Sequence, residues 1–212
     1  MTTNETKRVH NLIIVDESGS MEIIRKQAYT GLNETLQTIR QMQKKFPGQE
    51  QRITLLTFNT ERTSWLYDNA TSAETKDLDW EDYCPDGGTP LYDAIGKGVS
   101  KVNAEIKEGD NVLVTIITDG EENSSREWTL ELVSNMIAKL KKQGWTFTLI
   151  GTDNLDVKKM ARNFDIGDHL TFTEDADGTR AMFAKERRCR SNFYECICND
   201  NSVPEGSYFS QD

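Results

Sequence analysis

Two short runs of almost unbroken apolar residues, LIIV at 12–15 and VLVTII at 112–117, constrain the fold most strongly. Strands with one solvated face alternate apolar and polar residues, whereas strands buried on both faces do not. These runs therefore predict central strands of a parallel sheet that helices cover on both sides. Further strands are expected at 53–58, 145–150 and 169–173, where β-branched and aromatic residues gather.

Amphipathic helices are predicted between these strands. Apolar residues recur three or four positions apart over residues 22–46, 91–106 and 130–140, which gives each segment one apolar stripe for packing on a sheet. Inside the second segment, Gly96 and Gly98 disfavour a helix by about 1 kcal/mol each. We interpret these glycines as positions where the helix packs closely on the sheet.

Residues 63–67 form one more expected strand, and the short connection NTER separates it from the strand at 53–58. A parallel crossover needs about a dozen residues or more, so this pair must be an antiparallel hairpin. Strands and helices alternate along the rest of the chain. The pattern predicts an α/β fold with a doubly wound, mostly parallel central sheet and one antiparallel edge.

The size and charge of the chain limit its domain count and its partners. Its 212 residues show no linker-like interruption, which favours one domain. The formal net charge of -10 argues against a nucleic-acid partner, and we attribute the basic run KERRCR at 185–190 to a solvated helix end. The polar N-terminus does not resemble a signal peptide, and no apolar stretch approaches the roughly 20 residues of a membrane helix. We therefore expect a cytoplasmic protein with no membrane contact.

Four cysteines are expected to be reduced thiols without a ligand. Three of them, Cys189, Cys196 and Cys198, follow a C-x6-C-x-C spacing that matches no standard zinc motif. A zinc site that combines these three with His169, or with a ligand from a partner, is kept as an alternative.

Both central strands end in an aspartate that small residues follow. Asp16 ends the first run and precedes Ser18 and Ser20 in DESGS, while Asp119 ends the second run in TDG. In open parallel sheets, ligands bind beyond the carboxyl ends of strands, where the winding reverses direction. If the two strands are neighbours at that reversal, the two aspartates face each other across a crevice. Thr89, in GGTP, lies between them in sequence and near the start of a predicted helix.

These five residues supply two carboxylates and three hydroxyls. An all-oxygen set suits a hard divalent cation, and Mg2+, which prefers six ligands, would keep at least one position open. On their own, Asp16, Ser18 and Ser20 are better explained as a strand end followed by a helix N-cap. The presence of Thr89 and Asp119 in the matching α/β pattern favours the metal site.

DESGS at 16–20, Thr89 in GGTP and Asp119 in TDG resemble the metal-ion-dependent adhesion site (MIDAS) of the von Willebrand factor A (VWA) domain family. All five motif positions occur in the family's order. The resemblance implies the strand order 3-2-1-4-5-6, with strand 3 antiparallel and helices on both faces of the sheet. The family does not explain the Cys-bearing end of the chain. We therefore expect three parts: an N-terminal tail (1–8), a VWA domain (9–190) and a Cys-containing, partly loose C-terminal extension (191–212).

The resemblance also implies roles for the five residues. Ser18, Ser20 and Thr89 would contact the ion directly, and Asp16 and Asp119 would do so directly or through water. In this family an acidic side chain of a protein partner typically fills the open coordination position. The implied function is a non-enzymatic, metal-dependent protein-interaction module, monomeric alone, that binds Mg2+, with Mn2+ or Ca2+ as alternatives. Intracellular members commonly serve assemblies, including ones with AAA-type ATPases, so such an assembly is an expected partner.

Two other functions stay open at this stage. A Mg2+-dependent phosphohydrolase-type enzyme would use Asp16 as its nucleophile. Such an enzyme usually needs a second acid–base carboxylate and a basic residue for phosphate, and no Lys or Arg adjoins Asp16, Thr89 or Asp119 in sequence. A domain that keeps the motif without using it is the other alternative.

Several residues beside the motif also receive an interpretation. Glu17, Glu121 and Glu122 are expected to form a solvated acidic rim, because most charged side chains are exposed. Trp80 and Tyr83, in the polar segment before GGTP, are candidates for a contact surface around the ion.

Overall fold

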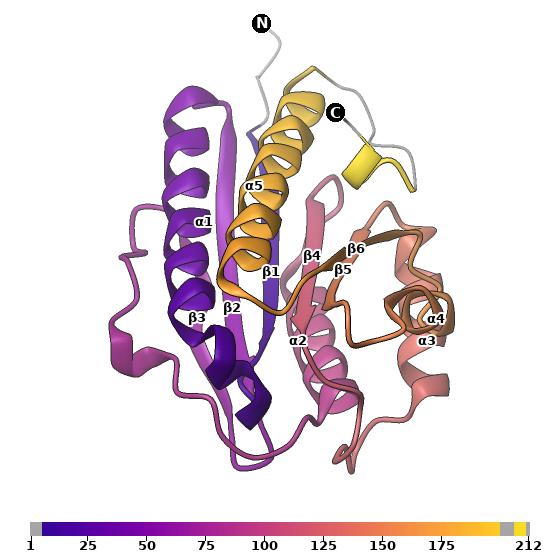
Figure 1. Ribbon diagram of the computed structural model, residues 1–212. Helices are drawn as coiled ribbons and strands as arrows, with labels where there is room; N and C mark the ends of the chain where they lie inside the picture. Colours follow the sequence, from indigo (N-terminus) through magenta and orange to yellow (C-terminus); the bar gives the residue numbers. More distant parts are fainter. Residues whose placement is uncertain (1–5, 200–205, 211–212) are drawn as a thin grey trace, which may run out of the picture.

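A six-stranded sheet with the order β3-β2-β1-β4-β5-β6 forms the centre of the computed structural model, which describes residues 6–199 and 206–210 (Figure 1). Neighbouring strands are parallel except β2 and β3, which are antiparallel. The predicted fold class, strand order and hairpin are confirmed. The strands are β1 (Lys7–Asp16), β2 (Gln49–Phe58), β3 (Thr63–Thr71), β4 (Asn111–Thr118), β5 (Thr146–Thr152) and β6 (Asp168–Phe172).

Helices cover both faces of this sheet and bury two separate hydrophobic cores. One face carries α1 (Arg25–Lys45) and α5 (Ala176–Cys198), which pack against each other (Figure 1). The other face carries α2 (Leu91–Glu105), α3 (Leu130–Lys141) and α4 (Val157–Asn163).

Alternate residues of β1 enter the two cores. Ile13 and Val15 pack under α1 and α5, whereas Leu12 and Ile14 pack under α2 and α3. This double burial explains why residues 12–15 form an unbroken apolar run rather than an alternating one.

The helices differ from the sequence expectation in two respects. A 3-10 helix, η1 (Gly19–Ile24), comes first and α1 begins only at Arg25, so the segment predicted as one helix at 22–46 is two elements. The sequence analysis did not identify α4 and α5.

At both glycines inside α2, Gly96 and Gly98, a neighbouring side chain packs so closely that a methyl group would not fit. A methyl group at Gly98 would lie 2.9 Å from Cδ2 of Leu56 and 3.2 Å from Cδ1 of Ile14, two side chains of the sheet. A methyl group at Gly96 would lie 2.1 Å from the ring of Trp128, in the segment before α3. The predicted contact with the sheet therefore holds at Gly98, whereas Gly96 accommodates an indole.

The end of the chain is packed where the structure describes it. Helix α5 continues to Cys198, so the predicted domain boundary after residue 190 falls inside a helix. Beyond it, the 3-10 helix η3 (Tyr208–Ser210) buries Tyr208 and Phe209. The backbone N–H of Tyr208 donates to Oδ1 of Asp168 (2.7 Å) and its hydroxyl donates to Oε1 of Glu186 (3.2 Å). At the other end, β1 already includes residues 7 and 8 of the predicted tail, and residues 1–5 lie outside the described part.

The basic run at 185–190 is not a single solvated surface. Arg190 is fully buried in the interior of the domain and donates hydrogen bonds to Glu186 (2.8 Å), Asn11 (2.8 Å) and Thr115 (2.7 Å). Arg187 forms an ion pair with Glu34 on α1. Arg190 therefore holds α5 on the sheet, Arg187 ties it to α1, and Arg188 is exposed. Within the described residues, no helix is both long and apolar enough to span a bilayer.

Candidate metal centre

The carboxyl ends of β1 and β4 lie side by side, because these two strands are paired in parallel up to Val15 opposite Ile117. Asp16 ends β1 and Asp119 follows β4 directly, so both reach the same edge of the sheet. The winding of the sheet reverses between these two strands, which is where ligands bind in open α/β folds.

Hydrogen bonds join four of the five residues predicted from the motif. Oδ1 of Asp16 accepts the backbone N–H of Ser18 at 2.8 Å, and Oδ2 accepts the hydroxyl of Thr118 at 2.6 Å. The hydroxyls of Ser18 and Ser20 lie 3.2 Å apart, and that of Ser20 donates to Oδ1 of Asp119 at 2.8 Å. The chain of contacts runs from one carboxylate to the other through the N–H of Ser18 and the hydroxyls of Ser18 and Ser20.

Thr89, the fifth residue, approaches the same point. A methyl group at Gly120 would lie 2.8 Å from the hydroxyl oxygen of Thr89 and 3.6 Å from Oδ2 of Asp16, so both oxygens border this glycine. Asn123 fixes the position of Thr89 through two hydrogen bonds. The N–H of Thr89 donates to Oδ1 of Asn123 (2.9 Å), and the N–H of Asn123 donates to the carbonyl of Thr89 (3.1 Å).

Four of these five side chains are almost inaccessible, while Ser20 is exposed. Asp16 and Asp119 retain 0% and 3% of their accessible surface, respectively. Oδ2 of Asp119 is buried and accepts no hydrogen bond from any described residue. A buried carboxylate oxygen without a partner costs free energy, and native proteins usually supply a donor or a cation.

Both carboxylates resist ionisation when no cation is near. Burial raises the pKa of Asp119 to about 7, the charge of Asp16 adds to this rise, and the hydrogen bond from Ser20 opposes it. Burial also raises the pKa of Asp16, against the hydrogen bonds from Thr118 and Ser18. A divalent cation between the two would favour both charged forms, so the donor set fits a hard metal ion.

Glu17 is a supporting residue and not part of a solvated rim, contrary to the prediction. Its side chain is fully buried and accepts hydrogen bonds from Thr57 (2.7 Å), from Arg62 (2.8 Å) and from the N–H of Cys84 (2.6 Å). Because Asp16 points into the site, Glu17 points the other way, toward the loop before α2. It thereby ties the motif loop to that loop, as does the backbone bond from Gly19 N–H to the carbonyl of Gly87 (3.0 Å).

The other neighbours of the motif divide into structural and exposed residues. Glu122 accepts the N–H groups of Ser124 and Ser125 and that of Tyr92, so it holds the loop after β4 against α2. Glu121 is exposed, as expected for the rim.

Of the two aromatic candidates, only one lies at the surface. Tyr83 is fully buried and its hydroxyl donates to the carbonyl of Asp16 at 2.7 Å. It therefore stabilises the backbone at the start of the motif loop. Trp80 is 41% exposed and packs over the guanidinium of Arg25 at 4.1 Å. The predicted contact surface can therefore include Trp80 but not Tyr83.

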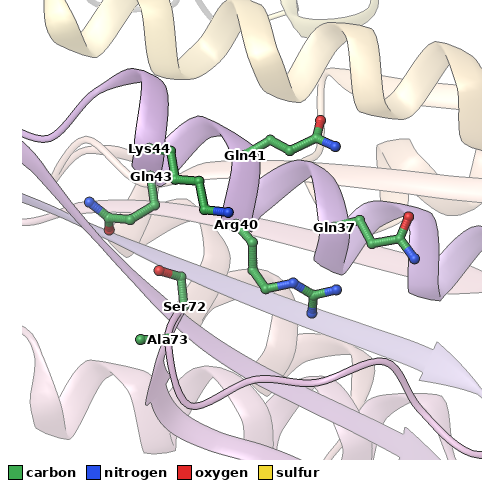
Figure 2. A pocket seen from close by; sticks show the side chains of 7 residues that line it. All are labelled: Gln37, Arg40, Gln41, Gln43, Lys44, Ser72 and Ala73. Carbon is green, nitrogen blue, oxygen red and sulfur yellow. The ribbon is translucent and has the colours of Figure 1, made fainter.

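Other candidate sites do not involve the motif. Figure 2 shows a pocket between the outer face of α1 and the segment after β3, where Arg40 and Lys44 lie opposite Ser72 and Ala73. In the part of the chain that the structure describes, no three or more His, Cys, Asp or Glu side chains gather to hold a metal. The zinc alternative at Cys189, Cys196 and Cys198 therefore finds no support.

Comparison with family models matches residues 12–185 to the von Willebrand factor type A domain. No curated protein sequence matches the chain. Among solved structures, the vWF domain of the type V pili tip protein Mfa5 from Porphyromonas gingivalis is 12% identical with a TM-score of 0.64, covering 94% of this chain and 98% of that domain.

Two larger proteins are similar over one part of their length. The pilus adhesin SpaC from Lactobacillus rhamnosus GG, in its open conformation, is 15% identical with a TM-score of 0.64, and the match covers 89% of this chain and 30% of the adhesin. Proximal thread matrix protein 1 from the mussel byssus is 16% identical with a TM-score of 0.56, covering 91% of this chain and 46% of that protein. At such identities the likeness establishes the fold alone.

Proposed function

Because the chain belongs to the von Willebrand factor type A domain family, we propose that it is a protein-interaction module that holds a divalent cation at a MIDAS. Asp16, Ser18, Ser20, Thr89 and Asp119 would hold the ion, with Mg2+ favoured by the all-oxygen set and Mn2+ or Ca2+ as alternatives. The observation that carries the proposal is the buried Oδ2 of Asp119, which accepts no hydrogen bond within the described chain.

The partner in this proposal offers an Asp or Glu side chain to the ion. Two carboxylates of the domain balance the charge of a divalent cation, and five protein ligands leave at least one of six positions open. A carboxylate is the strongest common side-chain ligand for a hard cation in that position. The likeness to a pilus adhesin supports an interaction role and identifies no partner.

Catalysis by Asp16 is the less favoured alternative. Its carboxylate is fully buried, and both of its oxygens already accept hydrogen bonds, from Ser18 and Thr118. A phosphohydrolase nucleophile must reach the phosphorus atom and usually has a cationic group beside it. We therefore propose a non-enzymatic module. Turnover of phosphoesters that Asp16→Asn removes would restore the enzyme alternative.

Further properties are proposed on the sequence and the family resemblance alone. They are a cytoplasmic location, a monomeric state in isolation, and service in an assembly that contains an AAA-type ATPase. A nucleic-acid partner is not proposed, because the net charge is -10 and Arg190 of the one basic run is buried.

Calorimetric titration of the metal-stripped protein with Mg2+ and with Mn2+ tests the site. We expect one ion per chain and a rise in melting temperature with metal concentration, because the ion binds the folded state. Both effects should disappear in Asp119→Ala and persist in Glu121→Ala, a matched control that removes an exposed carboxylate two residues away. Binding that survives Asp119→Ala, or no binding in the parent chain, would refute the metal assignment.

A further inference from the structure

A groove lies next to the proposed metal site, between the start of α2, the loop after β4 and α4. It encloses about 170 Å3, and its lining includes Leu91, Tyr92, Glu121, Asp156 and Met160. Leu91 and Tyr92 follow Thr89 by two and three residues, and Glu121 follows Asp119 by two. Since two residues span at most about 7 Å of chain, two walls of the groove continue directly from the metal loops.

The groove combines two partly exposed apolar side chains, Tyr92 and Met160, with a largely polar and acidic lining. Leu91 is fully buried, and Tyr92 and Met160 pack partly buried against the same core. The rim carries the exposed carboxylates of Glu121 and Asp156. Within the described chain Glu121 has no ion-pair or hydrogen-bond partner, whereas Asp156 accepts the N–H of Lys159 at the start of α4.

A side chain with an apolar stem and a cationic head fits this combination. Lysine and arginine lay their methylene stems along apolar surface and keep the charge at the rim. Here the stem would lie along the partly exposed Tyr92 and Met160, and the head would meet Glu121. Lys159 also lines the groove, but the carboxylates of Glu121, Glu122 and Asp156 outnumber it, so the lining keeps a negative charge that a cationic head can meet.

The surroundings of the site point to the same partner chemistry. Further exposed carboxylates lie at this edge of the sheet, Glu22 on η1 and Glu61, Asp86 and Asp153 on loops. The ion with its two aspartates has no net charge, so an acidic partner alone would meet a negative field. Positive charge beside the acid removes this repulsion and speeds the encounter.

We propose that the partner presents an Asp or Glu to the ion and, within about four residues of it, a Lys or Arg to this groove. This inference rests on the proposed metal-dependent function and adds the charge pattern of the partner segment.

A displayed peptide library with one fixed aspartate and four randomised residues on each side tests the pattern. The library is captured on the immobilised, Mg2+-loaded protein, and only peptides that a chelator releases are sequenced. We expect Lys and Arg in the flanks to be enriched roughly two- to fivefold over the input, the range of an exposed ion pair. The enrichment should disappear in Glu121→Lys. It should persist in Glu108→Lys, which reverses an exposed charge before β4, at the opposite end of the sheet.

Mg2+ titration of the same preparations separates the two hypotheses. If Mg2+ binds normally but the released peptides lack basic flanks, or if Glu121→Lys keeps the enrichment, the groove assignment is refuted and the metal site stands. The same holds if Mg2+ binds and a chelator releases no peptide. If Mg2+ does not bind the parent chain, the proposed function itself fails, and the partner pattern fails with it.

Discussion

At the scale of single residues, the motif loop depends on the buried carboxylate of Glu17, which is not one of the five motif residues. Glu17 directly follows Asp16, the first motif residue, and accepts hydrogen bonds from three separate segments, at Thr57, Arg62 and Cys84. Of the ion pair in this cluster, the side chain of Arg62 is 48% exposed, whereas that of Glu17 is fully buried. The position of the loop with Ser18 and Ser20 therefore depends on a carboxylate that faces away from the proposed metal site.

Glu17→Gln should destabilise the fold by about 1–3 kcal/mol, because a neutral amide replaces an acceptor of charge-assisted hydrogen bonds and leaves a buried donor unmatched. It should also weaken Mg2+ binding, since the loop loses its tie to the segment before α2. Urea unfolding and metal titration measure the two effects. Glu121→Gln, an exposed carboxylate on the same edge, should change stability by less than about 0.5 kcal/mol. Equal effects of the two substitutions would contradict a buried anchoring role.

The sequence identified the five motif residues but not their supports. Asp, Ser and Thr at these spacings carry their chemistry in the residue type, so the pattern is visible without a structure. Glu17 looks like any surface glutamate, because its partners Thr57 and Cys84 lie 40 and 67 residues away. The role of Asn123 cannot be recognised from the sequence for the same reason, because its partner Thr89 lies 34 residues away.

At the scale of elements, α2 shows how sequence propensity yields to packing. Its apolar period predicted a helix correctly despite two internal glycines. The lack of side chains at Gly96 and Gly98 lets α2 approach Trp128 on one side and the sheet on the other. This close approach places the start of α2, and with it Thr89, at the edge of the sheet.

Gly96→Ala should therefore destabilise the domain, although alanine favours an isolated helix by about 1 kcal/mol. The new methyl would overlap the Trp128 ring, and overpacking of this kind costs about 1–3 kcal/mol. Denaturant unfolding of the parent chain and of Gly96→Ala measures the change in the free energy of unfolding. The matched control is Gly48→Ala, where nothing lies within 4 Å of the added methyl and stability should stay equal or rise slightly. A stabilising Gly96→Ala would mean that the indole moves away at no cost.

Helices α4 and α5 were not predicted from the sequence, for two different physical reasons. Helix α4 has only 7 residues, too few for a periodic pattern to show. The buried side of α5 includes Glu186 and Arg190, which neutralise each other through a 2.7 Å ion pair inside the domain. A polar pair of this kind interrupts the apolar stripe, so the helix does not show the pattern of a core-facing element.

At the scale of the whole molecule, the end of the chain closes the core between α5 and β6. Tyr208 and Phe209 join the same hydrophobic core as α1 and α5. Asp168 at the start of β6 accepts the N–H groups of Gly206 (2.9 Å) and Tyr208 (2.7 Å). The family model ends at residue 185, before this contact, so neither the motif nor the family pattern indicated it.

A chain that ends at Asn199 loses the buried Tyr208 and Phe209 and should be less stable than the longer chain by at least about 3–5 kcal/mol, the usual cost of removing one large buried aromatic side chain. Tyr208→Phe should cost only about 1 kcal/mol, because it removes the hydrogen bond to Glu186 and keeps the packing. Urea unfolding measures the free energy of unfolding of the parent chain, the shortened chain and Tyr208→Phe. Mg2+ titration of the shortened chain shows whether the proposed metal site, at the carboxyl ends of the strands, still forms. If the shortened chain is as stable as the full one, the C-terminal segment is an appendage and the domain ends with α5. If stability falls in the expected order, residues 206–210 belong to the folding unit, and experiments on the metal site require the complete chain.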